Sequence, residues 1–215
     1  MTQSQGARLD SPEAERARSR YDRIAPLYDV MDALPERRYR AWRRRLWPML
    51  RGPRVLEVGV GTGKNMPYYP EDLAITAIDL SPKMLERAQR RASDLGIEVD
   101  LQPGDAQALE FVDETFDEVV ATFVFCSVPD PVLGLREARR VLKPGGRLRL
   151  LEHVRAGNAL LGRIQDVANP LSVRMSGVNI NRRTVDSVEA SGLAIERVED
   201  VGMRGIFKLI VATKT

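Results

Sequence analysis

Near residue 54 the apolar positions change from a helical period to short, nearly continuous runs. These runs predict strands at 54–58, 74–79, 97–102, 117–124 and 146–152, and the segments between them predict helices at 64–69, 82–94 and 131–142. A further helix is expected at 183–191, where Gly192 ends it, and two strands follow at 194–201 and 206–213. Strands that alternate with helices are typical of a parallel sheet covered on both faces. We therefore expect an α/β fold with helices on both sides of one sheet.

The segment before residue 51 is predicted to be helical. Ser11 and Pro12, with acidic residues in the first turn, indicate a helix start, and Pro26 is expected to kink or split that helix. A second helix is expected at 36–50, with arginines around an apolar stripe. Residues 1–10 are polar without an apolar period, which is typical of disorder. The apolar positions of the two helices are Tyr21, Ile24, Ala25 and Tyr28, then Tyr39, Trp42, Leu46 and Leu50.

The composition excludes several classes of protein. A chain of 215 residues is long enough for one domain with a sizeable core. No apolar run approaches the ~20 residues of a membrane-spanning helix, and residues 1–20 lack the apolar centre of a signal peptide. With one cysteine, Cys126, and one histidine, the chain has no set of ligands for zinc and no internal disulfide. We expect no metal and a cytoplasmic location.

The charge is concentrated at one end of the chain. The net charge is +3, but residues 1–54 carry 13 arginines against 7 acidic residues. One explanation is the base composition of the genome. The other is a basic face that meets phosphate head groups or another anionic surface. The second predicts peripheral contact with an anionic membrane at its inner face; no nucleic acid partner is expected.

Three alternating glycines follow the first predicted strand. Gly59, Gly61 and Gly63 allow a sharp turn and let a ligand touch the main chain, because no Cβ stands in the way. The following helix start offers free N–H groups to a carboxylate or phosphate. Asp79, at the end of the next strand, is placed to bind both hydroxyls of a ribose. Together they predict a nucleoside-containing ligand at the strand tips; the alternative is a tight turn without a ligand.

The segment 54–65, with Glu57 before the turn, resembles motif I of the class I S-adenosylmethionine-dependent methyltransferases. Dinucleotide-binding folds prefer a third glycine one position later. Segments 79–85, 104–109, 116–122 and 140–148 are similar to the later signatures of the same family, in the family's order. The resemblance implies a Rossmann-like, doubly wound sheet of seven mostly parallel strands with an antiparallel C-terminal hairpin. It also implies S-adenosylmethionine as the cofactor.

The resemblance also implies which residues bind that cofactor. In the family, the residue matching Asp79 holds the ribose, Met84 lies near the adenine, and Asp105 accepts from the adenine amino group. The segment 21–29 resembles the opening segment of quinone C-methyltransferases and bacterial phospholipid N-methyltransferases, which forms a lid over the cofactor; residues 1–50 are thus a lid segment before a domain at 51–215. The cofactor-binding residues expected are Tyr21, Glu57, Gly59, Gly61, Gly63, Asn65, Asp79, Leu80, Met84, Asp105, Ala106 and Thr122.

The methyl acceptor is predicted from the segments that differ between groups of the family. Segments 122–129, 152–154 and 179–184 are similar to a phospholipid- and thiol-methyltransferase-like group, whereas quinone enzymes usually carry a Gly-Leu-Arg-Asn type sequence at 125–128. We expect a small amphiphilic acceptor, foremost the amino head group of phosphatidylethanolamine. A lipophilic quinol, phenol or thiol stays open, as do a dinucleotide-dependent oxidoreductase and a noncatalytic S-adenosylmethionine-binding protein.

Methyl transfer from a sulfonium mainly requires alignment of the reacting atoms and exclusion of water. A general base matters more for a phenol, a thiol or a ring carbon than for a neutral amine. His153, just past the fifth strand, and Tyr28 in the lid are the candidate catalytic residues; the alternative for His153 is a structural role in a turn. The segment 155–182 is expected to be a cap whose apolar residues either line an acceptor pocket or close the core: Leu160, Leu161, Ile164, Leu171 and Met175.

Overall fold

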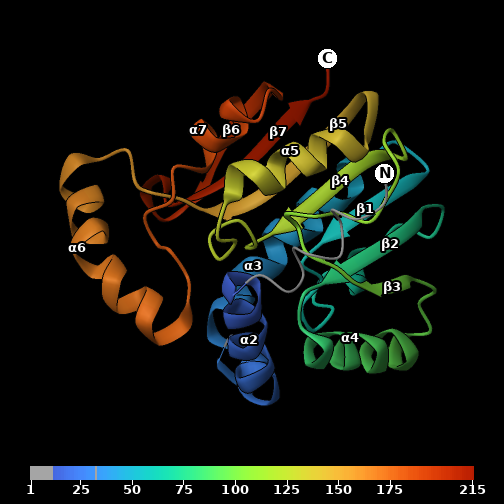
Figure 1. Cartoon of the computed structure of the whole chain (residues 1–215), viewed down its shortest axis with the longest axis horizontal. Coiled ribbons are helices and arrows are strands. Elements are labelled where there is room, and N and C mark those ends of the chain that lie inside the picture. The colour runs from blue at the N-terminus through green and yellow to red at the C-terminus, as the bar shows by residue number, and fades with distance from the viewer. Residues whose placement is uncertain (1–11, 32) are drawn as a thin grey trace.

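A computed structural model describes residues 12–31 and 33–215, and in it one twisted sheet forms the centre of the molecule (Figure 1). The sheet has seven strands in the order β3-β2-β1-β4-β5-β7-β6. The first five pair in parallel, and β7 runs antiparallel to both of its neighbours. The predicted mostly parallel sheet with an antiparallel C-terminal hairpin is therefore confirmed. The strands are β1 (Arg54–Val58), β2 (Ala74–Asp79), β3 (Asp100–Pro103), β4 (Phe116–Thr122), β5 (Leu142–His153), β6 (Ala194–Gly202) and β7 (Phe207–Thr213).

The residues that the structure describes also form six α-helices and three short 3-10 turns. Ser81 begins α4, because its side chain accepts a hydrogen bond from Met84 N at 3.2 Å. Gly96, with φ of 65°, ends the same helix in the left-handed conformation that glycine favours. The helices are α2 (Pro12–Met31), α3 (Ala33–Leu46), α4 (Pro82–Leu95), α5 (Pro131–Val141), α6 (Ala159–Ser176) and α7 (Thr184–Ala190); the turns are η1 (Trp47–Met49), η2 (Met66–Tyr68) and η3 (Met203–Gly205).

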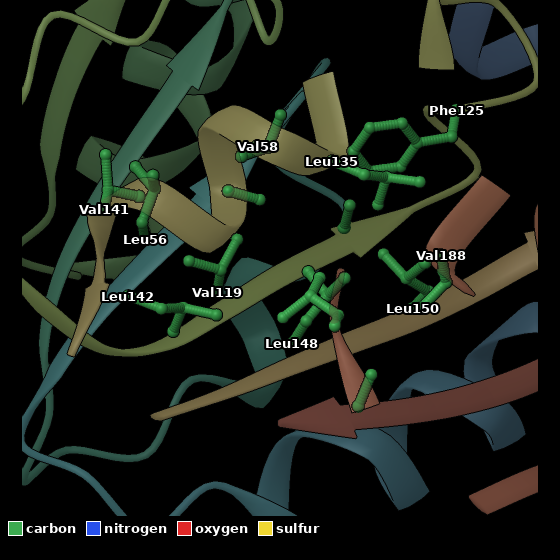
Figure 2. Packing of buried hydrophobic residues seen from close by; sticks show 14 of the residues in the cluster. Leu56, Val58, Val119, Phe125, Leu135, Val141, Leu142, Leu148, Leu150 and Val188 are labelled. Carbon is green, nitrogen blue, oxygen red and sulfur yellow. The ribbon is translucent and has the colours of Figure 1, made fainter. Parts of the chain in front are cut away.

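Side chains that alternate along the strands fill one core layer on each face of the sheet. On one face, β1, β4 and β5 pack against α5 and α7, as Figure 2 shows for Leu56, Leu135 and Val188. On the other, residues such as Val55 and Val120 pack against the end of α3 and η1, where Trp47 is fully buried. Burial of one large apolar side chain stabilises a fold by ~1.5–3 kcal/mol, so these two layers hold the sheet rigid beneath the site.

The strand order reverses between β1 and β4. The chain proceeds from β1 to β2 and β3 on one side, then crosses to β4 and β5 on the other. At such a reversal the connections leave in opposite directions, and a crevice opens outside the carboxyl ends of the strands. Gly59 N and Val60 N both donate to Ile78 O, at 2.8 and 2.9 Å, which fixes the turn after β1 against the end of β2.

The structure differs from the sequence-based expectations at three places. The predicted helix 64–69 is a turn followed by η2, because Pro67 and Pro70 lack the N–H groups that a helix needs. The glycine turn is therefore not followed by a regular helix start. Pro26 does not split the first helix into two elements, since α2 is continuous from Pro12 to Met31. Strand β4 ends at Thr122, two residues early, because Phe123 has a positive φ of 61°. The expected disorder of residues 1–10 and the helix start at Ser11 lie outside the described residues.

Helix α3 turns its aromatic side towards the protein. Tyr39 contacts Phe123 with ring centroids 4.5 Å apart, and Trp42 contacts Phe207 at 5.0 Å. Leu46 is fully buried on the sheet. Tyr39 and Trp42 are partly buried, and their rings pack against other aromatic side chains of the protein.

Candidate cofactor and acceptor cleft

The glycine turn after β1 needs glycine for two different reasons. Gly59, Gly61 and Gly63 all have positive φ, at 72°, 56° and 79°, a conformation that strains other residues. A Cβ at Gly59 would lie 2.5 Å from the Val124 side chain, and one at Gly63 would lie 2.7 Å from Met66 Sδ. Around Gly61 the space is open. Gly59 and Gly63 therefore allow close packing, whereas Gly61 keeps the main chain accessible to a ligand.

Asp79 joins this turn to the start of α4. Its Oδ2 accepts from Gly61 N at 2.8 Å and its Oδ1 accepts from Ser81 N at 2.9 Å. Burial raises the pKa of Asp79 to about 6, although the two N–H groups favour the charged form. Each carboxylate oxygen has further lone pairs, so the group is able to accept from a pair of ribose hydroxyls as well.

Asp105 follows β3 and is held in place by its neighbours. Its Oδ1 accepts from Gln107 N at 2.8 Å, and Gln107 Oε1 in turn accepts from Asp130 N at the start of α5, also at 2.8 Å. Asp105 is buried and lies beside Ala106 in the wall of the crevice. A carboxylate fixed in this way can accept from an exocyclic amino group.

A cleft at the carboxyl ends of the strands brings most of the predicted residues together. Its lining contains ten of them: Tyr21, Tyr28, Gly59, Gly61, Asp79, Leu80, Met84, Asp105, Ala106 and Thr122. The sequence reasoning missed the other lining residues, whose signal was their position directly before or after predicted strand ends or on the lid helix. They are Ala17, Val58, Gly104, Phe123, Val124, Ser127, Val128 and Pro129.

Glu57 and Asn65, two predicted cofactor residues, lie behind the glycine turn and do not line the cleft, and Gly63 does not line it either. Asn65 Nδ2 donates to Glu57 Oε1 at 2.5 Å and to Thr122 Oγ1 at 2.9 Å. Tyr69 also donates to Glu57, and Arg43 Nη1 donates to Asn65 Oδ1 at 2.8 Å. Burial raises the pKa of Glu57 to about 7, while the Tyr69 and Asn65 hydrogen bonds oppose this shift. In this structure the network supports the turn from behind.

Helix α2 covers the cleft and is attached through two aspartates. Ser81 Oγ donates to Asp22 Oδ1 at 2.6 Å, at the N-terminus of α4. Thr62 Oγ1 donates to Asp29 Oδ1 at 2.7 Å, and Arg87 Nη2 lies 2.7 Å from Asp29 Oδ2. The lid is therefore bonded both to the glycine turn and to α4. These aspartates have no local sequence signal, because their partners Ser81 and Arg87 lie about 60 positions away in the chain.

His153 does not line the cleft, and the ring of Phe207 lies between it and the cleft residue Phe123. Its imidazole packs edge to face on Phe207 with centroids 5.2 Å apart, and Phe207 in turn packs on Phe123, which lines the cleft. Burial lowers the pKa of His153, so the ring is neutral at pH 7. Its Nδ1 is buried and has no hydrogen-bond partner within the described part of the chain. The predicted catalytic role thus needs an acceptor or a water that reaches past Phe207.

Two further properties bear on the chemistry. The residues that the structure describes contain no group of three His, Cys, Asp or Glu side chains placed to hold a metal ion. Over the same residues, no helix is both long and apolar enough to cross a bilayer. Cys126 is buried, and burial raises the pKa of its thiol well above the usual value, so the thiolate is disfavoured.

Known proteins match the part of the chain that forms this cleft. A family model described as a methyltransferase domain matches residues 56–150. A phosphatidylethanolamine N-methyltransferase from Cereibacter sphaeroides is 46% identical over 105 residues, which cover 48% of this chain and 52% of that protein. A demethylmenaquinone methyltransferase from Renibacterium salmoninarum is 40% identical over 151 residues, 68% of this chain and 62% of that protein. This chain therefore spans about half to two thirds of the length of these relatives.

The fold has solved counterparts too. A structure from Thermotoga maritima, described as a S-adenosylmethionine-dependent methyltransferase and possible histamine N-methyltransferase, superposes with a TM-score of 0.69. It is 24% identical, and the match covers 92% of this chain and 99% of that one. At this identity the likeness shows the fold alone. The family model falls on most of the strands and loops that build the cleft, so this chain carries a class I S-adenosylmethionine-dependent methyltransferase domain, with S-adenosylmethionine as the cofactor.

Proposed function

We propose that this protein transfers a methyl group from S-adenosylmethionine to the amino head group of phosphatidylethanolamine. The order of the strands carries the proposal, because it separates the two ends of the cleft. Asp79 ends β2 and Asp105 follows β3, whereas Phe123 and the segment 124–129 follow β4, on the other side of the glycine turn. The polar end suits ribose and adenine. The acceptor end is walled by apolar and aromatic groups, which suits an amphiphilic acceptor.

An amine acceptor agrees with the chemistry of that end. S-adenosylmethionine, when bound, supplies a methyl carbon that is already activated. An amine must be neutral to attack it, and apolar surroundings lower the pKa of an ammonium group. The wall formed by Phe123, Val124, Val128 and Pro129 therefore favours the neutral amine without a general base. In the lid, Tyr21 and Tyr28 are placed to orient the acceptor and exclude water.

The residues proposed to bind the cofactor are those of the glycine turn, Asp79, Asp105 and the lid. Asp79 would take the ribose, Asp105 the adenine amino group, and Leu80 and Met84 would pack on the adenine. Gly61 leaves room for the ligand beside the main chain, which supports this assignment. Glu57, Asn65 and Thr122 would hold the turn in shape, since their hydrogen bonds join it to β1 and β4.

The test is a methyl-transfer assay with a panel of acceptors. The purified protein is incubated with S-adenosylmethionine labelled in the methyl group and with phosphatidylethanolamine vesicles, a demethylated menaquinol or a small aliphatic thiol. We expect label in monomethylated phosphatidylethanolamine. Label in the quinol or thiol alone would reject the acceptor while leaving the family intact. The similarity to a phosphatidylethanolamine enzyme supports the first outcome.

C-methylation of a quinol is the second candidate. The demethylmenaquinone methyltransferase match covers more of this chain, 68% against 48%, and supports it. A ring carbon needs removal of a proton during the reaction, so this candidate requires a base near the acceptor. His153 would then have to act past Phe207. Either lipophilic acceptor would bring the protein to the inner face of a membrane as a peripheral protein.

A further inference from the structure

Helix α6, inside the predicted cap, has an apolar stripe that faces away from the protein. Five large apolar side chains at spacings of three or four residues lie on one side of it, and each is more than half exposed. Val167, in the middle of the stripe, is 83% exposed. None of them lines the cofactor cleft, so the expected pocket lining is wrong for this cleft. The stripe consists of Leu160, Ile164, Val167, Leu171 and Met175.

The side of α6 that faces the protein is polar instead. Gln165 is buried, and its Nε2 donates to Val154 O at 3.1 Å and to Ile180 O at 2.7 Å. Asn169 Oδ1 accepts from Ile180 N at 2.8 Å, and Ser172 Oγ donates to Val178 O at 2.8 Å. A helix on the surface of a globular protein normally has the opposite arrangement. The contacts that hold α6 in place therefore leave its apolar stripe free for an apolar environment.

Arginines border this stripe. Arg163 and Arg174 are exposed and lie along one edge of it, by their helical positions. At the C-terminal end of α6, Arg174 lines a surface hollow together with Arg16, Arg20 and Arg23 of α2. Within residues 12–31 and 33–215, none of these arginines forms an ion pair, and Glu15 is the acidic residue that shares the hollow. Figure 1 shows α2 and α6 extending beyond the sheet on the same side of the molecule.

The acidic residue of α6 does not offset this charge. Asp166 is paired with Arg155, whose Nη2 lies 2.8 Å from its Oδ2. The outer stripe of α2 continues from Arg16, Arg20 and Arg23 to two exposed apolar residues, Leu27 and Val30, which are 62% and 74% exposed. Basic groups beside an exposed apolar stripe are the combination that binds anionic lipid, because the apolar groups enter the acyl region and the cations meet phosphate.

We propose that the stripe of α6, with Arg163, Arg174 and the arginines of α2, is the surface that docks this protein on an anionic lipid bilayer. The charge complementarity decides between a bilayer and a second copy of the chain. In a two-fold dimer the same patch meets itself, so the arginines of the two copies would be brought together unpaired. The surface goes beyond the proposed reaction, since it concerns where the protein sits whichever acceptor is methylated.

The experiment is co-sedimentation of the whole protein with vesicles of phosphatidylglycerol and phosphatidylcholine, compared with vesicles of phosphatidylcholine alone. We expect binding to the anionic vesicles that weakens as salt is raised to ~0.5 M, because exposed charges are then screened. The double variant Val167→Ser, Leu171→Ser should lower the partition coefficient at least about tenfold. The double variant Arg163→Ala, Arg174→Ala should lower it about 25-fold, or about fivefold for each arginine.

Two variants elsewhere on the surface serve as controls. Val112 is 78% exposed on the loop between β3 and β4, outside α2 and α6, and Arg90 is an exposed residue of α4. Val112→Ser and Arg90→Ala should sediment like the original protein. Binding of S-adenosylhomocysteine, followed by calorimetry, should be unchanged in all four variants, which shows that they are folded and that the cleft is intact.

Three results would overturn the proposal. The first is no binding of the original protein to anionic vesicles at low salt. The second is equal loss of binding in the control variants, which would indicate a nonspecific effect of surface charge and apolarity. The third is a dimer in solution that Val167→Ser and Leu171→Ser dissociate, because the stripe would then be covered by a second copy. Methyl transfer to phosphatidylethanolamine dispersed in detergent tests the acceptor separately from the surface.

Discussion

Asp79 connects three parts of the cofactor cleft through one carboxylate, since it accepts from Gly61 N and Ser81 N and faces the space beside the turn. Replacing it by alanine leaves both N–H groups and the proposed ribose hydroxyls without their charged acceptor. Hydrogen bonds to a charged group contribute roughly 1.5–3 kcal/mol, so we expect Asp79→Ala to weaken S-adenosylhomocysteine binding about 10- to 150-fold. Isothermal titration calorimetry measures the effect.

Asp79→Asn and Asp94→Ala complete that experiment. The asparagine keeps one oxygen acceptor without the charge and should lose less affinity than the alanine. Asp94 is an exposed residue of α4 outside the cleft, so its alanine variant should bind like the original protein. Because burial raises the pKa of Asp79 to about 6, affinity should also fall as the pH drops below 6. A folded Asp79→Ala variant with undiminished affinity would reject the ribose assignment.

His153 distinguishes the two acceptor candidates at the residue scale. It does not line the cleft, and the ring of Phe207 lies against both it and Phe123. If the acceptor is an amine in an apolar wall, His153→Ala should change turnover less than about tenfold. If a ring carbon is methylated and His153 is the base, the rate should fall about 10²- to 10⁴-fold. Single-turnover rates on the true acceptor, with cofactor affinity as the control, separate these outcomes.

The cofactor side of the cleft could be predicted from sequence because its signals are local. The three glycines and the acidic residue at the end of the next strand lie within about 25 residues of one another, and the positive φ angles of the turn require the glycines. Glu57 shows the limit of this reasoning. Its position before the turn was predicted, but its side chain turns away from the cleft to Asn65 and Tyr69. Side chains alternate between the two faces of a strand, so Glu57 lies on the face of Val55, where α3 packs. Its partners there cannot be predicted from the motif, because Arg43 of α3, which donates to Asn65, comes from outside it.

Helix α2 is held closed by Asp29, so this element provides the next prediction. Asp29 accepts from Thr62 and forms ion pairs with Arg87 and Arg91 at 2.7 and 3.1 Å. Its carboxylate is about one quarter exposed, and pairs of this kind contribute ~1 kcal/mol at most. Asp29→Asn should therefore weaken S-adenosylhomocysteine binding about fivefold, mainly through faster dissociation, because the lid opens more often.

The lid variant is checked by stopped-flow dissociation of S-adenosylhomocysteine. Asp186→Asn, which removes an exposed pair with Arg183 on α7, is the matched control and should leave the dissociation rate unchanged. An Asp29→Asn variant whose dissociation rate equals that of the original protein would show that α2 stays closed without this contact.

Among the elements, the strands and the helices that cover them were predictable, and α6 was not. Strands buried on both faces and helices with one apolar face have periods that can be read locally. In α6 the period is present, but its apolar side faces outward and its polar side bonds the chain at 154–156 and 178–180. A periodic pattern predicts an amphipathic helix, with one apolar and one polar side. It does not predict which side meets the protein, because that depends on the hydrogen-bonding groups of the opposing segment.

Across the whole molecule, buried carboxylates connect stability to pH. Glu57 and Glu152 are fully buried, and burial raises the pKa of each from 4.5 to about 7. The native state therefore holds protons that the unfolded chain has already lost between pH 4.5 and 7. Each group therefore lowers the free energy of unfolding as the pH rises through that window. Above the folded-state pKa its contribution no longer changes with pH. Glu152 also accepts from Val124 N and Phe125 N, so it links this effect to the acceptor end of the cleft.

Glu152→Gln should remove much of this pH dependence. The amide keeps an oxygen for Val124 N and Phe125 N but has no charge to bury, although the Oε2 position offers no partner for its NH₂ within the described residues. We therefore compare the free energy of unfolding of the variant with that of the original protein. From pH 5 to pH 8 this difference should shift in favour of the variant by on the order of 2–3 kcal/mol, whatever its value at either pH. Urea unfolding at both pH values measures the difference, with Glu189→Gln, an exposed residue of α7, as control. An equal shift at pH 5 and pH 8 would show that Glu152 does not titrate in this window.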